Sequence, residues 1–388
     1  MAHIRLASQA FHRPAEWVRH ARTVLAWPGG ETVYYKEFPG ALASATKEVS
    51  AIAAAVAQFE PVTLVVDRTR LEEARSRFAP GTTRHKVSLH PIDGKQLDLW
   101  MRDIAPTFTL KTGPKGPSSG ILCGVDFNFN GWGNKFRTET SVGLGTETCV
   151  GLARTLLKDL KIERIESSLV TEGGAIEVDG EGTMVATESS IINDNRNPGM
   201  SREDIEAEFA RTLGIEKFIW IPGVHGVEVT DCHIDAFVRF ARPGVVLLSK
   251  PSSEESRNAN SVWVRAYKEA VDVLSGTKDA KGRSLEVIEI SEPNVSEVAM
   301  DEEFLKAIES SELPPPAFNY ANYLMVNGGL IFPQFGDKRS DASALETIQR
   351  LFGSERDVVT VPLQELPLMG GGIHCATQQI PLSTSVSP

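Results

Sequence analysis

The chain has 388 residues, of which 41% are hydrophobic and 23% are charged, and its net charge is −11. These values are typical of a globular protein with a substantial core and exclude disorder over most of the chain. The acidic balance and the lack of a basic cluster argue against nucleic acid or a membrane as a partner, whereas a cationic substrate is compatible with them.

Targeting signals and disulfide motifs are not evident in the sequence. Residues 1–13 contain no apolar run of signal-peptide length, and no later run approaches about 18 uncharged apolar residues. The four cysteines, Cys123, Cys149, Cys232 and Cys375, show neither C-x-x-C spacing nor the density of a disulfide framework. We therefore expect a cytoplasmic protein whose thiols are reduced.

Helical and extended patterns alternate in the first half of the chain. Val49, Ile52 and Val56 recur at helical spacing, which predicts a helix with one buried face. Residues 111–120 contain two prolines and three glycines and predict an exposed loop. The same patterns predict further elements: strands at 62–66, near 87–89 and at 123–129, and helices at 71–78 and 151–160.

Two turn motifs in the second half each separate a pair of short strands. Asp179-Gly180 and Asn327-Gly328 lie between short alternating runs, a pattern that predicts β-hairpins. The remaining patterns predict a helix opened by a capping box at 201–204, strands at 218–221, 285–290 and 358–361, a strand pair turning at 242–244, and helices at 261–274 and 345–351.

Hairpins, helices and further strands recur about five times along the chain, without a strict sequence period. This mixture argues against an all-parallel, doubly wound sheet. No G-x-G-x-x-G motif or P-loop follows a predicted strand, so nucleotide binding has no support. The sequence therefore predicts an α/β protein built from repeated hairpin and helix units.

A candidate nucleophile lies in the glycine-rich stretch 370–379. Three glycines, 370–372, allow a tight turn and leave space beside the backbone, so Cys375 can be presented to a small ligand. The alternative is a buried structural thiol, since free cysteine is among the most buried residue types. A nucleophilic thiol also needs a base and groups that hold its electrophile.

Three polar residues alternate at Asp231, His233 and Asp235, so on a strand all three would face one side. Same-face neighbours lie about 6.6 Å apart, whereas metal ligands converge within about 2 Å of one ion, so a shared metal is disfavoured. His233 and Asp235 could instead flank a flat organic cation. The alternative is an exposed polar edge.

Three further residues are candidates for supporting roles. Asp103 follows an aromatic residue and a cation in 100–102. An arginine next to an aspartate also occurs on solvated protein surfaces. Glu172 precedes two glycines and is either a loop acid or an acid placed to orient His233. His374 is adjacent to Cys375, but neighbours on an extended segment point to opposite faces, so His233 is the better candidate base.

Together these stretches resemble the agmatine deiminases and Porphyromonas-type peptidyl-arginine deiminases of the guanidine-modifying superfamily. The similarity covers nearly the whole chain. The matching motifs occur in the expected order, at residues 13–17, 26–28, 100–103, 129–133, 172–174, 195–198, 230–235, 333–337 and 370–379.

The resemblance implies the α/β pentein fold, a pseudo-symmetric propeller of five modules with the site on its axis. It implies a single catalytic domain over 1–388, with 383–388 as a frayed tail, and no metal or organic cofactor. The roles it transfers are the nucleophile on Cys375, the general acid/base on His233, guanidinium-binding acids on Asp103 and Asp235, and the histidine-supporting acid on Glu172.

The chain departs from the family pattern near the substrate. Cys232 replaces a common glycine, Ala236 replaces an asparagine, and 104–105 replace Thr-Gly. The catalytic set is intact, so these changes concern the lining of the pocket. Trp27, Trp132 and Asn195 are candidates for that lining from their motifs, and they are equally compatible with core aromatics and a turn residue.

The function that we expect is hydrolysis of agmatine to N-carbamoylputrescine and ammonia through a covalent thiouronium on Cys375. Free arginine and peptidyl-arginine are the main rival substrates, since Arg196 or Arg239 would offer a partner for a carboxylate. A non-catalytic guanidine-binding protein is the alternative of another class. A homo-oligomer is compatible with these expectations.

Overall fold

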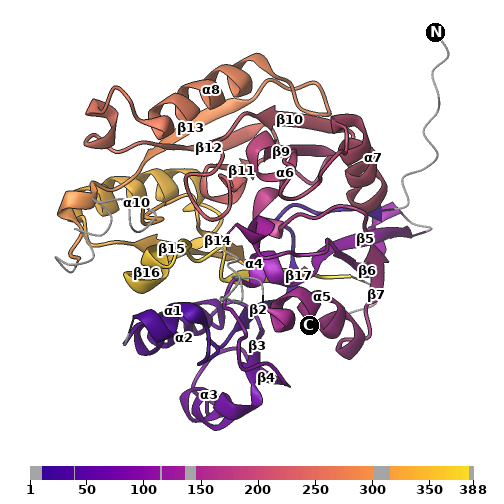
Figure 1. Ribbon diagram of the computed structural model, residues 1–388, viewed down its shortest axis with the longest axis vertical. Coiled ribbons are helices and arrows are strands. Elements are labelled where there is room, and N and C mark those ends of the chain that lie inside the picture. Colours follow the sequence, from indigo (N-terminus) through magenta and orange to yellow (C-terminus); the bar gives the residue numbers. More distant parts are fainter. Residues whose placement is uncertain (1–10, 39, 114–115, 136–145, 301–314, 384–388) are drawn as a thin grey trace.

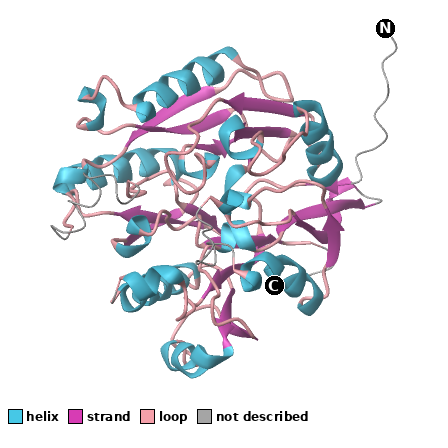
Figure 2. Cartoon of the chain, viewed as in Figure 1, coloured by secondary structure: helices cyan, strands magenta, loops and turns pink. Residues whose placement is uncertain are grey.

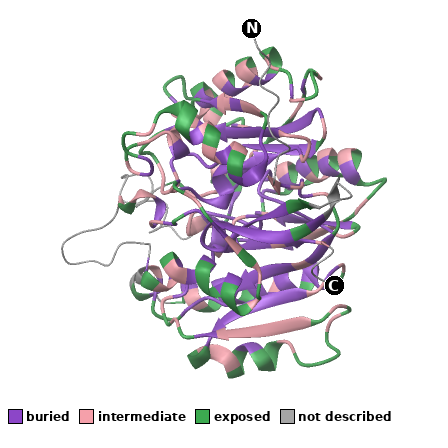
Figure 3. Ribbon diagram, turned by 90° about the vertical axis from the view of Figure 1, so that its right-hand side faces the viewer, coloured by how far each residue is buried: buried purple, intermediate pink, exposed green. Residues whose placement is uncertain are grey.

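The computed structural model describes residues 11–38, 40–113, 116–135, 146–300 and 315–383. Its strands form five separate sheets, and the longer helices lie toward the outside of the molecule (Figures 1 and 2). Buried residues follow the strands, while exposed residues gather on helices and loops (Figure 3). This arrangement confirms the expected α/β protein of hairpins and helices.

The strands are β1 Phe11–His12, β2 His20–Ala26, β3 Val62–Asp67, β4 Val87–Ile92, β5 Thr107–Gly113, β6 Gly116–Asp126, β7 Glu163–Glu166, β8 Glu177–Val178, β9 Thr183–Thr187, β10 Lys217–Ile221, β11 Val238–Arg242, β12 Val245–Lys250, β13 Glu286–Ser291, β14 Leu324–Val326, β15 Gly329–Gln334, β16 Asp357–Pro362 and β17 Thr377–Pro381. The helices are α1 Val33–Glu37, α2 Ala41–Val56, α3 Leu71–Arg77, α4 Met101–Ile104, α5 Glu147–Asp159, α6 Glu188–Ile191, α7 Arg202–Leu213, α8 Val262–Gly276, α10 Lys338–Phe352 and α11 Glu365–Leu368.

All five sheets share one pattern, which we call a module. Two strands pair antiparallel, a helix follows, and a third strand then pairs parallel to the second. The modules are β5-β6-α5-β7, β8-β9-α7-β10, β11-β12-α8-β13, β14-β15-α10-β16 and β17-β2-α2-β3. β4 extends the last of these sheets, and β1 extends the sheet of β5.

The module that contains β2 takes its first strand from the far end of the chain. β17 pairs antiparallel with β2, in the register Thr377↔Leu25, and Figure 1 shows these two labels side by side. A strand beyond the glycine triplet was not predicted from the sequence. β17 follows the module of β14, β15 and β16 in the chain and pairs with β2, so it connects that module to the sheet of β2. It also sets the position of the residues that precede it.

Most predicted elements are confirmed within a few residues. The buried face of α2 contains Val49, Ile52 and Val56, which are at most 1% exposed. The capping box of α7 is present, because the Ser201 side chain accepts from the backbone of Asp204 and Asp204 accepts in return. Each such feature depends on local sequence alone.

The expected loop at 111–120 is wrong. β5 and β6 pair antiparallel from Thr107↔Val125 to Gly113↔Gly116, and only residues 114–115 between them lie outside the described ranges. Glycine and proline mark the reversal of the chain, but backbone pairing extends both strands up to it. In the predicted tail, Ser383 forms a β-bridge, and residues 384–388 lie outside the description.

Buried charged side chains link the modules at the centre of the molecule. Arg239 of β11 is fully buried and donates to the carbonyl oxygens of Ala321 at 3.1 Å and Tyr323 at 2.9 Å. Its guanidinium also lies 2.9 Å from Glu16 and 3.2 Å from Glu177. One side chain of β11 therefore contacts residues beside three other modules.

Glu16 is the shared carboxylate of this centre. Its Oε1 accepts from the Met325 backbone at 2.8 Å, its Oε2 lies 2.7 Å from His374 Nε2, and Arg102 is 3.6 Å away. Burial alone would raise the pKa of Glu16, but the charges of Arg239 and His374 hold that pKa well below its usual range. The carboxylate is therefore ionised, and it compensates the buried cations around it.

We predict that Glu16→Gln lowers the free energy of unfolding by about 3–5 kcal/mol, because it removes one of the two anions beside the buried Arg239 and a carboxylate partner of His374. The exposed pair of Glu31 and Lys95, at 3.6 Å, supplies the control, since Glu31→Gln should cost less than about 1 kcal/mol. Urea and thermal unfolding of both variants measure the difference. Equal effects would contradict the central role of Glu16.

Candidate active site

The predicted catalytic residues occupy one structural position in successive modules. Each lies shortly before the first strand of its module, and the side chains meet where those strands begin. The residues and the strands that follow them are Asp103 before β5, Glu172 before β8, His233 and Asp235 before β11, and Cys375 before β17. Residues up to 272 positions apart in sequence are thus brought together by the symmetry of the fold.

Gly174 marks the point where three of these side chains converge. A β-carbon at Gly174 would lie 2.6 Å from His233 Nδ1, 2.9 Å from Asp103 Oδ1 and 3.2 Å from Asp235 Oδ2. Only a residue without a side chain leaves room between these three groups. The Glu172-Gly173-Gly174 stretch therefore supplies both an acid and the space beside it.

Asp103 is fixed by two donors. Trp132 Nε1 donates to Oδ2 at 2.9 Å, and the Gly174 backbone donates to Oδ1 at 3.0 Å. Burial raises the pKa of Asp103 to about 6, and the negative charges of Asp235 and Glu172 act in the same direction against the opposing charge of His233. The carboxylate is thus oriented, and a further cation beside it would favour its ionised form.

His233 lies between two carboxylates. Its Nε2 is 3.2 Å from Glu172 Oε2, and its Nδ1 is 3.8 Å from Asp103 Oδ1. Burial alone would lower the pKa of His233, but the charges of Asp103 and Glu172 outweigh it and raise that pKa to about 9. The imidazole is therefore protonated at neutral pH and can donate a proton.

The backbone of 231–235 does not form the strand on which its three alternating polar residues would share one face. Asp231 and Cys232 have positive φ values of 62° and 71°, and a short 3-10 helix, Ile234–Ala236, follows. Left-handed residues interrupt the extended backbone that the alternation of polar residues had indicated. Cys232 thus adopts a conformation that suits glycine, the common family residue here, and its side chain lines the cavity described below.

Cys375 is held by Asn322 and faces Asp235. Asn322 Nδ2 donates to the sulfur at 3.1 Å, and Asn322 Oδ1 accepts from the Cys375 backbone at 3.2 Å. The sulfur lies 3.6 Å from Asp235 Oδ2. Burial, with the negative charges of Asp235 and Asp103, raises the pKa of the thiol well above its ordinary value.

Asn322 was not among the residues predicted from the sequence. It lies just before β14, the position that the catalytic residues occupy in the other four modules. An asparagine is a common turn residue, so its type alone gave no signal. Its position ahead of the predicted strand at 324–326 would have been such a signal if the five modules had been aligned with one another.

His374 has both ring nitrogens engaged. Nδ1 lies 2.7 Å from Asp235 Oδ2, and Nε2 lies 2.7 Å from Glu16 Oε2. The residue therefore connects the central charged group to a carboxylate of the site. This geometry suits an orienting role for His374 and leaves His233 as the candidate acid/base.

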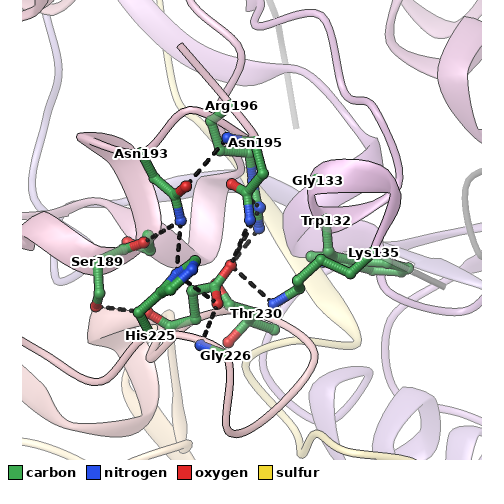
Figure 4. A network of polar contacts seen from close by, with 12 residues as sticks. Trp132, Gly133, Lys135, Ser189, Asn193, Asn195, Arg196, His225, Gly226 and Thr230 are labelled. Atoms are coloured by element: carbon green, nitrogen blue, oxygen red, sulfur yellow. Dashed lines mark hydrogen bonds and ion pairs between the residues drawn. The ribbon is translucent and has the colours of Figure 1, made fainter. Parts of the chain in front are cut away.

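Asp231 is the centre of a second polar network beside the site. Its carboxylate lies 2.7 Å from Lys135 Nζ and 3.3 Å from Arg196 NH1, and it accepts from Asn195 Nδ2 at 3.0 Å. Figure 4 shows Lys135 on one segment and the sequence neighbours Asn195 and Arg196 on another, pointing toward one another. Arg196 Nε also donates to Glu172 at 2.8 Å, which couples this network to His233.

The three candidates for the substrate lining take different positions in the structure. Trp27 is 1% exposed and packs edge-on against Phe78. Trp132 is bonded to Asp103, and Asn195 to Asp231. In the described part of the chain, none of the three borders the cavity beside Cys375.

That cavity has a volume of about 310 Å³ and reaches Cys375, His233 and Asp235. Its apolar walls include Trp263, Phe318 and several prolines. Among the described residues, five carboxylates and no lysine or arginine border it. The acids are Glu228, Asp235, Glu254, Glu255 and Glu292. A small organic cation fits this combination of charge and apolar surface.

The described ranges contain neither a cluster of metal-binding side chains nor a membrane-spanning helix. No group of three or more histidine, cysteine or acidic side chains there is arranged to hold a metal ion. No helix in the same ranges is both long and apolar enough to cross a membrane.

Comparisons with known proteins point to one family. Residues 12–381 match the sequence family described as Porphyromonas-type peptidyl-arginine deiminase. Agmatine deiminases of Ectopseudomonas mendocina and Medicago truncatula are 37% and 33% identical to the chain, and each alignment covers 96% of both sequences. A solved structure described as agmatine deiminase of Enterococcus faecalis catalyzing its reaction has a TM-score of 0.79 at 27% identity, covering 96% of both chains. With the five modules, this likeness confirms the predicted pentein fold.

We predict that Gly174→Ala lowers kcat by about 100-fold or more, because the added methyl group displaces His233 and Asp103 from their working positions. The glycine has no positive φ, so its backbone accepts alanine. Gly151→Ala in α5 is the control, since nothing lies within 4 Å of its β-carbon. Steady-state kinetics and a melting curve for each variant test this. Normal activity of Gly174→Ala would contradict the claim that these side chains need the space beside Gly174.

We also predict that the free protein alkylates slowly at neutral pH. Because burial and carboxylates raise the pKa of Cys375, its reaction with iodoacetamide should keep accelerating with pH above the ordinary thiol value of about 8.5. Intact-mass kinetics from pH 6 to 10 measure the rate, and Cys375→Ala corrects for the other thiols. A plateau near neutral pH would show that the thiolate is already formed.

Proposed function

Since the chain belongs to the Porphyromonas-type peptidyl-arginine deiminase family, we propose that it is an agmatine deiminase, which hydrolyses agmatine to N-carbamoylputrescine and ammonia. In this proposal the five modules form one catalytic domain. Cys375 is the nucleophile, His233 the general acid and base, and Asp103 and Asp235 hold the guanidinium group. Glu172 supports His233. The cytoplasmic location and the homo-oligomer expected from the sequence stay predictions.

One observation carries this proposal. Asp235 Oδ1 and His233 Nδ1 are buried and have no hydrogen-bond partner among the described residues. Unpaired buried polar groups are costly, so the free carboxylate oxygen beside the thiol suits a ligand that donates hydrogen bonds, and the Nδ1–H of the protonated His233 stays available to the departing amino group. A guanidinium offers five N–H donors in a plane and a permanent positive charge.

The substrate itself would activate the thiol. In the free protein the carboxylates of Asp235 and Asp103 keep the pKa of Cys375 high. A guanidinium between these carboxylates neutralises their charge, and it adds a positive charge beside the sulfur. Because His233 is already protonated, the thiol releases its proton to solvent when its electrophile binds, and Asn322 Nδ2 donates a hydrogen bond to the resulting thiolate.

The reaction then proceeds through a covalent intermediate. The sulfur of Cys375 attacks the central guanidinium carbon while Asp103 and Asp235 bind the nitrogens and stabilise the positive charge. The protonated His233 gives its proton to the departing amino group, so the C–N bond breaks and ammonia leaves. The neutral imidazole next takes a proton from water, which attacks the thiouronium carbon. The C–S bond breaks, and the ureido product is released.

The charges favour agmatine over arginine as the substrate. Arg196 is 2% exposed and paired with Glu172 and Asp231, and Arg239 is fully buried and paired with Glu16 and Glu177. Both candidate partners for a substrate carboxylate are thus already engaged. The acidic cavity would repel a carboxylate and attract an ammonium group.

The test is ammonia release from agmatine, free arginine and a blocked internal-arginine peptide, each offered to the purified protein with Cys375→Ala as control. We expect release from agmatine at a kcat/KM at least about 100-fold above the other two, since the cavity lining disfavours a carboxylate. Cys375→Ala should bind agmatine and release no ammonia.

Other outcomes have distinct meanings. Release mainly from an arginine substrate would keep the mechanism and overturn the substrate. Binding of agmatine without release by the unmodified protein would indicate a guanidine-binding protein. Turnover by Cys375→Ala would overturn the nucleophile.

A further inference from the structure

The cavity beside Cys375 extends to a carboxylate that the proposed chemistry does not use. Glu292 follows β13, is half-buried and borders the same cavity as Cys375 and Asp235. Its Oε1 accepts from Ser249 Oγ and from Asn319 Nδ2, both at 2.8 Å. This carboxylate is therefore held in a defined orientation by two donors.

The anchor of Glu292 is part of the segment that also holds the thiol. Asn319 Oδ1 accepts from the Ala321 backbone at 2.8 Å, and Asn322, which bonds the sulfur of Cys375, follows directly. The segment 319–322 thus contacts both the carboxylate and the nucleophile. The separation between the two groups is fixed by a short stretch of backbone.

Glu292 combines an orientation fixed by side chains with an oxygen that accepts no hydrogen bond within the described part of the chain, which distinguishes it from Glu228, and it is less exposed than Glu254. Glu228 is bonded through both oxygens to the turn containing Thr230 and Cys232, and Glu254 accepts from Ser296. Both bonds of Glu292 use Oε1, so Oε2 accepts no hydrogen bond from the described residues. No cation of the described chain forms an ion pair with it either.

The electrostatics of Glu292 match a site for a cation. Burial raises the pKa of Glu292 to about 7, and the neighbouring charge of Glu255 acts in the same direction. Two acids without a compensating cation are unfavourable close together, and a bound cation would relieve this repulsion. The unpaired, fully buried Asp235 Oδ1 at the inner part of the same cavity independently indicates a ligand with a positive charge there.

We propose that Glu292, assisted by the charge of Glu255, binds the primary ammonium group of the substrate and so selects a doubly charged guanidine. This inference rests on the proposed function, because it assigns the second end of the same substrate. The guanidinium lies at Asp235 and Cys375, and the apolar walls of Trp263 and Phe318 accompany the methylene chain between the two charged ends.

The test compares two substrates that differ only in the ammonium group. Agmatine carries it, and n-butylguanidine has the same guanidinium with an alkyl end. We expect Glu292→Gln to lower kcat/KM for agmatine by about 10- to 100-fold, mainly through KM, because one charge-assisted hydrogen bond is lost. The same change should alter kcat/KM for n-butylguanidine by less than about 3-fold, since that substrate makes no such bond.

The control and a conservative variant make the result specific. Glu289 lies on β13, shortly before Glu292, and its side chain is paired with Lys250 at the surface. Glu289→Gln should therefore leave kcat/KM for both substrates unchanged. Glu292→Asp keeps the charge and should retain part of the preference for agmatine. Melting curves identify any variant that fails to fold. If Glu292→Gln fails, Glu292→Asp alone decides, since a reduced but remaining preference for agmatine with full n-butylguanidine activity supports the contact.

The pH dependence gives a separate readout. The anion of Glu292 exists above its pKa of about 7 and is lost as the pH falls through that value. The preference of the unmodified protein for agmatine over n-butylguanidine should therefore decline below about pH 7, and Glu292→Gln should abolish this decline.

Two results would overturn the proposal. Equal losses of kcat/KM on both substrates in Glu292→Gln would show that Glu292 only supports the structure of the cavity. Unchanged kcat/KM on both substrates would show that it does not contact the ammonium group. A failure of the unmodified protein to release ammonia from agmatine would refute the proposed function instead, so the two failures are distinguishable.

Discussion

The structure depends on the buried carboxylate of Glu16. It compensates Arg239, accepts from the backbone of Met325 and contacts His374, so residues beside several modules are tied to one anion. His374 then contacts Asp235, the acid closest to the thiol among the contacts described. A buried ion pair contributes little net stability by itself, but breaking one is costly, so this centre specifies how the modules meet. The geometry of the site follows from that constraint.

Around this centre, the fold uses one position five times. Asp103, Glu172, Asp235, Asn322 and Cys375 each precede the first strand of a module, where the backbone leaves the centre. Each module contributes one or two polar groups, and none holds enough of them to do chemistry. Rigid strand ends position these groups, while the acidic cavity is bordered by loops such as 251–255 and 315–319. Catalysis and substrate selection are thus assigned to different parts of the modules.

The sequence predicted what local patterns encode. The hairpins at Asp179-Gly180 and Asn327-Gly328 and the capping box at Ser201 depend on neighbouring residues alone and are confirmed. The site residues were predicted from motifs, and the structure brings Cys375, His233, Asp103, Asp235 and Glu172 together, although their roles stay proposals. Asn322, Glu16 and β17 were missed because their partners lie far away in sequence. The alternating polar residues of 231–235 do not lie on a strand, because Asp231 and Cys232 have positive φ values that leave no trace in polarity.

The pairing of β17 with β2 has a consequence for the synthesis and folding of the protein. Residues 20–26 are synthesised early, yet their antiparallel partner and the adjoining Cys375 emerge only after more than three hundred further residues. Four modules can form locally, but the fifth sheet waits for the final contact, which makes ring closure a late and long-range step. The thiol and its acids are therefore brought together only at the end of this process. The enzyme becomes competent only when the ring is complete.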